Sequence, residues 1–187
     1  MNIFVLDNDA ATSANMMCDK HVVKMIVESC QLLSTAHHVL DGEELVVVSD
    51  KRKYKSYICT KKNICKATMI NHPCSIWARE NRANYIWLWR HAYALCKEYT
   101  YRYGKVHAME HMLLNELNDP PVNILKDKKT TPFAQAMPDK YRDENAVVAY
   151  RRYYINEKAG FAKWKNSQVP EWFVKKEPQV VAEVIPF

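Results

Sequence analysis

Glycine is scarce in this chain of 187 residues, which contains only Gly42, Gly104 and Gly160. Phosphate-cradling and dinucleotide-binding loops need several glycines within a few positions, so the sequence nearly excludes nucleotide-binding kinases and Rossmann enzymes. No apolar run is long enough to span a bilayer. No signal peptide opens the chain either, because Asp7 and Asp9 follow one short apolar stretch. We therefore expect a soluble, intracellular protein of the cytoplasm.

Paired Cys-x-x-Cys motifs are also lacking, although the chain has six cysteines. In an intracellular protein we expect these cysteines to be reduced thiols. Four residues of metal-ligating type lie fairly close together, namely Cys59, Cys65, His72 and Cys74. Their spacing matches no common zinc-ligand pattern, so a zinc-stabilised interaction module is a minor alternative. We assign the chain no metal and no cofactor.

Apolar and aromatic residues are plentiful, with a hydrophobic fraction of 48%, five tryptophans and eleven tyrosines. This composition indicates a folded globule, and the length suits one domain, residues 1–187, with a substantial core. The apolar start at residues 2–6 implies that the N-terminus is tucked against that core. Helical periodicity predicts three long helices and one shorter helix, at about 12–39, 76–103, 143–165 and 107–117. With a long crossing loop at 118–138 and an irregular tail at 170–187, we expect an all-α bundle.

The positive charge is concentrated in one segment. Within residues 50–66 seven basic residues oppose one acid, which equals the excess of +6 in the whole chain. The basic residues are Lys51, Arg52, Lys53, Lys55, Lys61, Lys62 and Lys66. With Tyr54 and Tyr57 among them, the pattern suits nucleic acid, although a solvated loop rich in lysine has the same composition. We expect residues 43–70 to form an inserted basic loop, in which the β-branched residues of Leu45–Val48 favour a short strand.

Residues 19–35 read DKHVVKMIVESCQLLST and have two distinct faces when wound as a helix. The apolar residues at helical spacing are Val23, Ile26, Val27, Cys30 and Leu33. The residues that share the polar stripe are His21, Lys24, Glu28, Gln31 and Thr35. Such a stripe is often only the solvated side of a helix. An imidazole, an amine and a carboxylate at one-turn and two-turn spacing are also a plausible catalytic group.

Several short blocks occur in a recognisable order. They are a hydrophobic start behind a free N-terminus, Asp19-x-His21 with Glu28 seven residues after the histidine, His72 with Trp77, Leu95-Cys96-Lys97-Glu98 with Arg102 and Gly104, and then Pro138, Tyr141-Arg142, Glu157-Lys158 and Pro170-x-Trp172. In this order and with these separations the chain resembles the phage pyrimidine-dimer DNA glycosylases. These are small all-α enzymes that also cleave DNA at abasic sites. The resemblance extends along most of the chain.

The resemblance implies a mechanism in which the N-terminal α-amine is the nucleophile. An α-amino group has a reference pKa of about 7.7–8.0, so a useful fraction of such groups is neutral at physiological pH. The amine of Met1, or of Asn2 if Met1 is removed despite the bulk of Asn2, would attack sugar C1′ and form an imine. Glu28 would stabilise the developing charge and help remove the 2′ proton before β-elimination. His21 would lie near the sugar-phosphate, and Lys24 is the fallback amine if the terminus is blocked.

The same resemblance implies double-stranded DNA with a lesion as the partner, and we expect a monomer. The expected DNA contacts are Lys24, Gln31, Lys51, Arg52, Lys53, His72, Arg79, Arg82, Arg151 and Arg152. Two arginines that flank the catalytic glutamate in the family are Val27 and Gln31 here. This departure leaves the preferred lesion open and makes the basic segment a candidate substitute for their grip on DNA. The alternatives are a glycosylase for another modified base and a non-catalytic DNA-binding protein.

Overall fold

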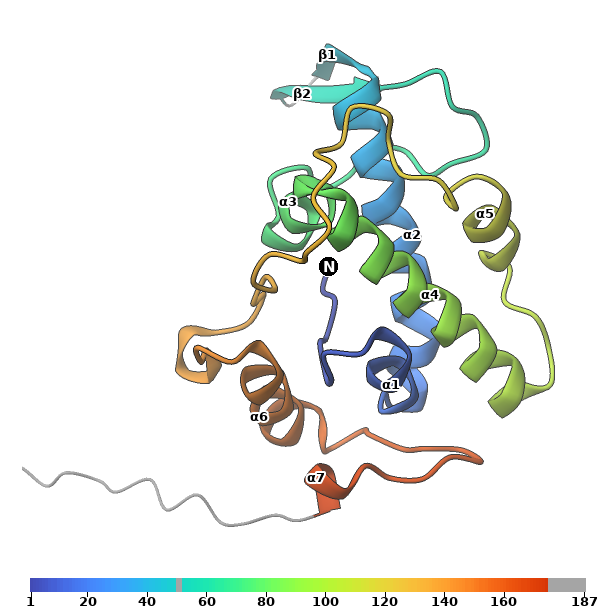
Figure 1. Cartoon of the computed structure of the whole chain (residues 1–187), viewed down its shortest axis with the longest axis vertical. Helices are drawn as coiled ribbons and strands as arrows, with labels where there is room; N and C mark the ends of the chain where they lie inside the picture. Colours follow the sequence, from blue (N-terminus) through green and yellow to red (C-terminus); the bar gives the residue numbers. More distant parts are fainter. Residues whose placement is uncertain (50–51, 175–187) are drawn as a thin grey trace, which may run out of the picture.

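The computed structural model describes residues 1–49 and 52–174, and this part of the chain is mostly helical (Figure 1). Its elements are α1 (Ala10–Asn15), α2 (Asp19–Asp41), β1 (Glu43–Ser49), β2 (Arg52–Ile58), α3 (Pro73–Glu80), α4 (Arg82–Tyr103), α5 (Glu110–Asn115), the 3₁₀ turn η1 (Asp139–Tyr141), α6 (Ala146–Lys158) and α7 (Glu171–Val174). Within the described ranges, none of the helices combines the length and apolar character that a membrane crossing requires.

The predicted first long helix is two helices. Asp9 caps α1 by accepting a hydrogen bond from the backbone N–H of Thr12 at 2.8 Å, and the chain turns before α2 begins. The buried face of α2 is wider than predicted, because Ile26, Cys30 and Leu33 are buried as expected and further residues are buried beside them. Val23 is 39% exposed, whereas Val22 and Met25 are buried. The helix packs against α4 and against α3.

The predicted second long helix is also interrupted. Asn81 has an extended backbone, and its side chain accepts a hydrogen bond from the N–H of Asn84 at 2.9 Å, so it ends α3 and caps α4. The start of α3 is earlier than predicted, with His72 as its cap and Pro73 in its first turn. Gly104 ends α4 in the left-handed conformation, at φ 68°, as the sequence predicts. The last predicted helix, at 143–165, is shorter and corresponds to α6.

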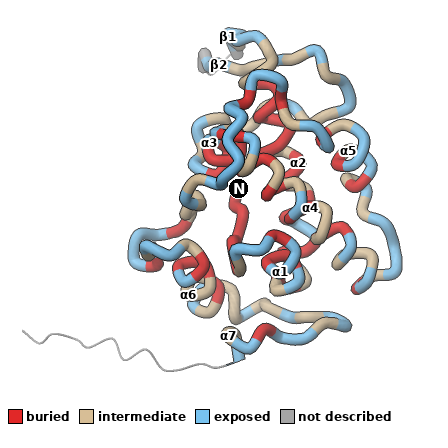
Figure 2. Tube along the Cα trace, in the orientation of Figure 1, coloured by how far each residue is buried: buried red, intermediate tan, exposed pale blue. Residues whose placement is uncertain are grey.

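The basic insertion contains a two-stranded hairpin, so the all-α prediction is wrong in this segment. Strands β1 and β2 pair antiparallel, from Glu43 opposite Ile58 to Ser49 opposite Arg52. The strand predicted at Leu45–Val48 is confirmed as part of β1. The hairpin extends from the end of α2 and is largely exposed (Figures 1 and 2).

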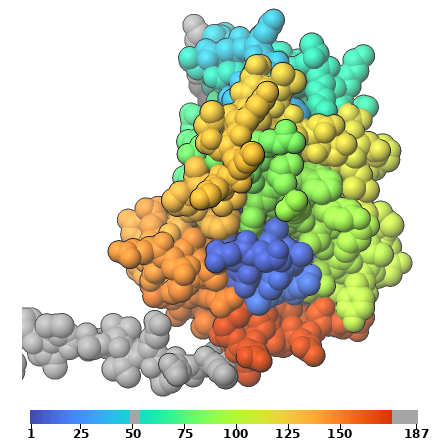
Figure 3. All heavy atoms as spheres, viewed as in Figure 1, coloured from blue at the N-terminus to red at the C-terminus, as the bar shows by residue number. Residues whose placement is uncertain are grey.

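The first residues of the chain enter the core, as their apolar character predicts. Ile3, Val5 and Leu6 are fully buried, and Phe4 is nearly so. Figure 2 shows this segment as a buried stretch that runs through the middle of the molecule. The expected long connection at 118–138 is confirmed, and it lies across one face between α5 and η1 (Figures 1 and 3).

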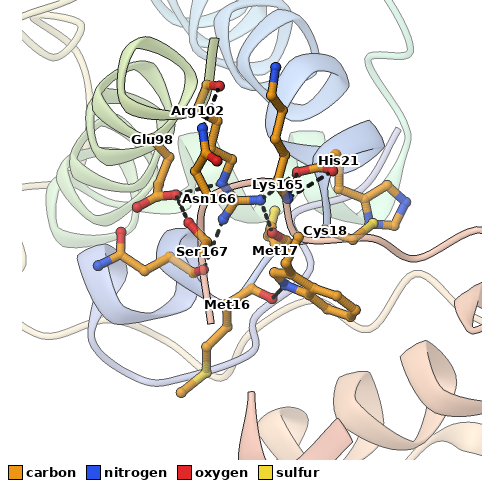
Figure 4. A network of polar contacts seen from close by, with 12 residues as sticks. Met16, Met17, Cys18, His21, Glu98, Arg102, Lys165, Asn166 and Ser167 are labelled. Carbon is orange, nitrogen blue, oxygen red and sulfur yellow. Dashed lines mark hydrogen bonds and ion pairs between the residues drawn. The ribbon is translucent and has the colours of Figure 1, made fainter. Parts of the chain in front are cut away.

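A buried arginine joins three parts of the chain (Figure 4). Arg102, near the end of α4, is 1% exposed and pairs with Glu98 at 2.7 Å and with Asp19 at 3.1 Å. It also donates to the backbone carbonyls of Asn15, at the end of α1, and of Met17, in the turn before α2. The backbone N–H of Lys165 donates to Asp19, and the Ser167 hydroxyl donates to Glu98. The network therefore fixes the start of α2, which carries Glu28 further along.

Candidate active site

The N-terminus of the chain lies beside Glu28 of α2. The α-amine of Met1 lies 4.0 Å from Oε2 of Glu28, and the backbone N–H of Asn2 donates to the same oxygen at 2.8 Å. Glu28 is only 9% exposed, so this carboxylate is largely removed from solvent. Asn2 and Glu28 are 26 positions apart in the sequence, and the buried course of residues 3–6 brings them together.

The side chain of Asn2 fixes the direction of the terminus. Its Nδ2 donates to the carbonyl of Ala136 at 2.8 Å. Its Oδ1 accepts from the backbone N–H of Ile3 at 2.8 Å and of Phe4 at 3.2 Å. Phe4 has a φ of 40°, which produces a tight turn directly after these bonds. Because Asn2 is buried and fully bonded, the amine at the start of the chain is held in one direction.

Lys24 provides a second amine at the same carboxylate. Its Nζ lies 3.3 Å from Oε1 of Glu28, one helical turn away, and its side chain is 67% exposed. Gln31 is half-buried on the next turn, and its carbonyl accepts from the Thr35 hydroxyl at 2.7 Å. The polar stripe of α2 thus extends from a solvent-exposed lysine, past the buried carboxylate, to Thr35.

His21 lies in an aromatic pocket under the N-terminal turn. Its ring stacks on Phe4 with centroids 4.3 Å apart, and its Nδ1 is 2.7 Å from the hydroxyl of Tyr154 on α6. Burial and, to a smaller extent, the charges of Lys158 and Lys24 together lower the pKa of His21 to about 4. The imidazole is therefore neutral near pH 7. Through Phe4 it supports the turn that positions the amine.

His72 caps the start of α3. Its Nδ1 accepts from the backbone N–H of Cys74 at 3.2 Å, so in the neutral ring Nε2 carries the proton. Burial and the nearby N-terminal charge lower the pKa of His72, and the charge of Glu28 opposes them. His72, which the sequence predicts as a DNA contact, is therefore within electrostatic reach of both members of the site.

The N-terminal amine and the buried Glu28 lie in a part of the chain that matches a known protein family. A family model described as pyrimidine dimer DNA glycosylase matches residues 1–112. This match covers more than half of the chain. The chain belongs to the pyrimidine dimer DNA glycosylase family. Comparison with curated proteins and with solved structures gave no match.

In this family member the segment that leads into α1 reaches the surface between α4 and the region around α6 (Figure 3). The matched residues include the N-terminus, Glu28 and His72, which are the groups that the fold brings together. Tyr154, the partner of His21, lies outside the matched part, on α6. Sequence reasoning missed Tyr154, and the only local signal is its helical spacing from the buried Tyr150.

The basic residues predicted on the DNA-binding side of this glycosylase family member are spread more widely. Arg79 on α3 is half-buried and donates to the Ser75 hydroxyl at 3.0 Å, and Arg82 is exposed at the start of α4. Lys51 lies outside the described residues. Arg52 and Lys53 begin β2, whose backbone alone is described there.

The arginines of α6 have partners within the protein. Arg151 donates to the carbonyl of Leu6 at 2.9 Å and lies over the ring of Trp172. Arg152 pairs with Asp143 at 3.2 Å. These contacts join α6 to the N-terminal segment and to the loop that precedes α6. DNA contact by the two arginines stays a prediction.

The four residues considered for zinc do not form a metal site in the described part of the chain. No group of three or more histidine, cysteine, aspartate and glutamate side chains there is arranged to hold a metal ion. Cys74 is buried, and burial raises the pKa of its thiol to about 12, which keeps it protonated.

Proposed function

We propose that this protein is a DNA glycosylase with abasic-site lyase activity, and that its substrate is a pyrimidine dimer in double-stranded DNA. The observation that carries the proposal is the position of the N-terminal amine, 4.0 Å from the buried carboxylate of Glu28. An amine with a carboxylate beside it, held by a buried asparagine, suits imine chemistry. Membership of the family supports the choice of DNA as substrate.

The proposed reaction begins with the neutral α-amine. Its lone pair forms a bond to sugar C1′, the bond from C1′ to the base breaks, and the base leaves with the electron pair. Loss of the amine proton and ring opening give an imine that links protein and sugar. Glu28 accepts the 2′ proton, a C1′–C2′ enamine forms, and the C3′–O bond breaks to release the 3′ phosphate. Water then hydrolyses the imine and restores the amine.

Either form of the terminus supplies the amine at Glu28. If Met1 is retained, its amine lies 4.0 Å from Oε2. If Met1 is removed, the amine is the nitrogen of Asn2, which lies 2.8 Å from the same oxygen. The side-chain bonds of Asn2 do not depend on Met1, so they hold the turn in both forms. Intact mass measurement of the active protein identifies the form.

A second candidate is the same chemistry on another damaged or modified base. The favouring observation is the pair Val27 and Gln31, which occupy the places of two family arginines and are half-buried beside Glu28. Neither side chain carries a charge, so the contacts to DNA at this point differ from those that two arginines would make. Duplexes with a thymine dimer, other damaged pyrimidines and modified bases, compared for base release, decide between the candidates.

The test of the mechanism is strand cleavage of an abasic duplex by Glu28→Gln. The amide keeps an acceptor for the N–H of Asn2 and removes the base, so we expect a loss of about 10²- to 10⁴-fold. Glu171→Gln on α7, an exposed glutamate, is the matched control and should cleave normally. A non-catalytic DNA-binding protein would show no cleavage and DNA binding that is indifferent to Glu28→Gln, which would overturn the proposal.

A further inference from the structure

A groove separates the hairpin from the chain that leads into α3. It has a volume of about 560 Å³ and is lined on one side by Tyr54, Lys55 and Ser56 of β2, and on the other by residues 67–72. We call this feature the hairpin groove. Most of its walls belong to the inserted segment and not to the residues around Glu28.

The hairpin groove shares His72 with the surroundings of the candidate active site. His72 closes one wall, and its electrostatic environment includes both the N-terminal amine and Glu28. On the same wall, the backbone N–H of Thr68 donates to the hydroxyl of Thr35 at 3.2 Å. Thr35 belongs to the polar stripe of α2, seven residues beyond Glu28. At 1.5 Å per residue, Thr35, which holds this wall of the groove, lies about 10 Å along the helix from Glu28.

The charge around the groove suits a polyanion. Residues 52–72 contain six basic residues and no acidic residue. Lys55 is balanced by Glu44 across the hairpin, at 2.7 Å. The remaining excess comes from the neighbouring basic residues, of which Lys62 and Lys66 are exposed. Together they create a local positive field that attracts phosphate groups.

The groove also has an apolar contact point held by its backbone. Met69 has a φ of 48°, which side chains other than glycine rarely adopt, and its side chain is 55% exposed. Its carbonyl accepts from the N–H of His72 at 2.9 Å, so a turn maintains this conformation. Strained residues cluster at binding sites, and an exposed thioether makes favourable contacts with aromatic rings. Met69 is thus placed to contact a base.

We propose that the hairpin groove binds the lesion-carrying DNA strand about three nucleotides from the reacting sugar, with a base against Met69 and Tyr54 and its phosphates near the basic residues. The distance follows from 10 Å of helix and a rise of about 3.4 Å per nucleotide. The position of the reacting sugar rests on the proposed function. Binding of DNA by the groove itself does not.

The test compares Met69→Gly with Asn63→Gly. Both residues have a positive φ, at 48° and 59°, so glycine fits the backbone at either position, but Asn63 is absent from the walls of the groove. The dissociation constant of a duplex with a stable abasic analogue is measured by fluorescence anisotropy. We expect Met69→Gly to weaken binding about three- to tenfold, and Asn63→Gly to leave it unchanged. Tyr54→Ala, on the opposite wall, should weaken it about tenfold.

Two truncated duplexes, each ending one nucleotide from the abasic analogue on one side, locate the effect. On one of them the difference between wild type and Met69→Gly should disappear. Equal binding by Met69→Gly, Tyr54→Ala and Asn63→Gly on the full duplex would overturn the groove proposal, as would a difference that survives both truncations. Borohydride trapping of wild type is run in parallel. Absence of an adduct there would reject the proposed chemistry, while anisotropy would still decide the groove.

Discussion

The buried arginine at the end of α4 provides the clearest test of the fold that positions the site. Arg102→Met keeps the apolar bulk of the side chain and removes its charge. Glu98 and Asp19 then lose their partner, and two backbone carbonyls lose their donor. Removing one member of a buried ion pair costs about 3–5 kcal/mol. For a chain of this length, that loss lowers the melting temperature by roughly 10 °C.

The assay is unfolding in urea or by heat, with Arg142→Met as the matched control. Arg142 pairs with Asp139 at 3.0 Å, but the two side chains are 54% and 89% exposed. Exposed pairs contribute about 0–1 kcal/mol, so the control should unfold almost as wild type does. A loss below about 1 kcal/mol for Arg102→Met would refute the claim that this network fixes the start of α2.

Three further predictions concern buried histidines, a buried hydroxyl and salt. The ordinary pKa of histidine is 6.5. Burial lowers the pKa to about 4 in His21 and in His37, and to about 3 in His91. The unfolded chain then binds more protons below about pH 6.5, so the free energy of unfolding should fall toward pH 4, by up to about 1.4 kcal/mol per pH unit for each histidine. Tyr154→Phe should cost about 1–3 kcal/mol in urea unfolding, because two buried groups lose their partner. Replacing Lys61 and Lys62 with Met should reduce the salt slope of DNA binding by up to about two.

Each of these has an outcome that contradicts it. Stability that stays constant between pH 6.5 and 4.5 would show that the histidines are not buried as neutral groups. Tyr101→Phe, at a residue that is 66% exposed, is the control for Tyr154→Phe, and equal stability of the two variants would exclude the hydroxyl role. An unchanged salt slope would exclude the two lysines as phosphate contacts.

The sequence was sufficient for the parts of the site that lie on one helix. Helical spacing alone places Lys24 one turn from Glu28, and the structure has them 3.3 Å apart. The contact between Glu28 and the N-terminus came only from the family resemblance. Asn2 and Glu28 are 26 positions apart, and the chain after Asn2 turns at Phe4 and enters the core. A periodic sequence pattern does not reveal a contact of this kind. The anchoring role of Asn2 was not predictable either, because its partner is the carbonyl of Ala136.

The missed helix break has a tertiary cause. Apolar periodicity continues through residues 76–103, so the sequence predicts one helix. Asn81 interrupts it because its side chain also donates to the carbonyl of Lys129 at 3.2 Å, and the N–H of Arg82 donates to Leu125 at 2.8 Å. Both partners belong to the long crossing loop. Its position could not be inferred from local pattern.

Of the two strands of the hairpin, the sequence predicted β1 and missed β2, for a similar reason. β1 is rich in β-branched residues, which favour a strand, whereas β2 reads as a run of lysines and tyrosines. Its strand character depends on pairing with β1, where Glu44 meets Lys55 at 2.7 Å and the Tyr57 hydroxyl at 2.9 Å. Cross-strand pairs of this kind stabilise a sheet but leave no periodic signal in one strand.

The central claim is that the amine at the start of the chain forms the imine, and one measurement tests it directly. Protein with a native terminus is trapped by borohydride on an abasic duplex, and the adduct is mapped by peptide mass spectrometry. The account predicts a single adduct on the N-terminal nitrogen of Met1 or Asn2, lost when that nitrogen is acetylated. An adduct that survives acetylation and maps to Lys24 would contradict it, as would the absence of any adduct.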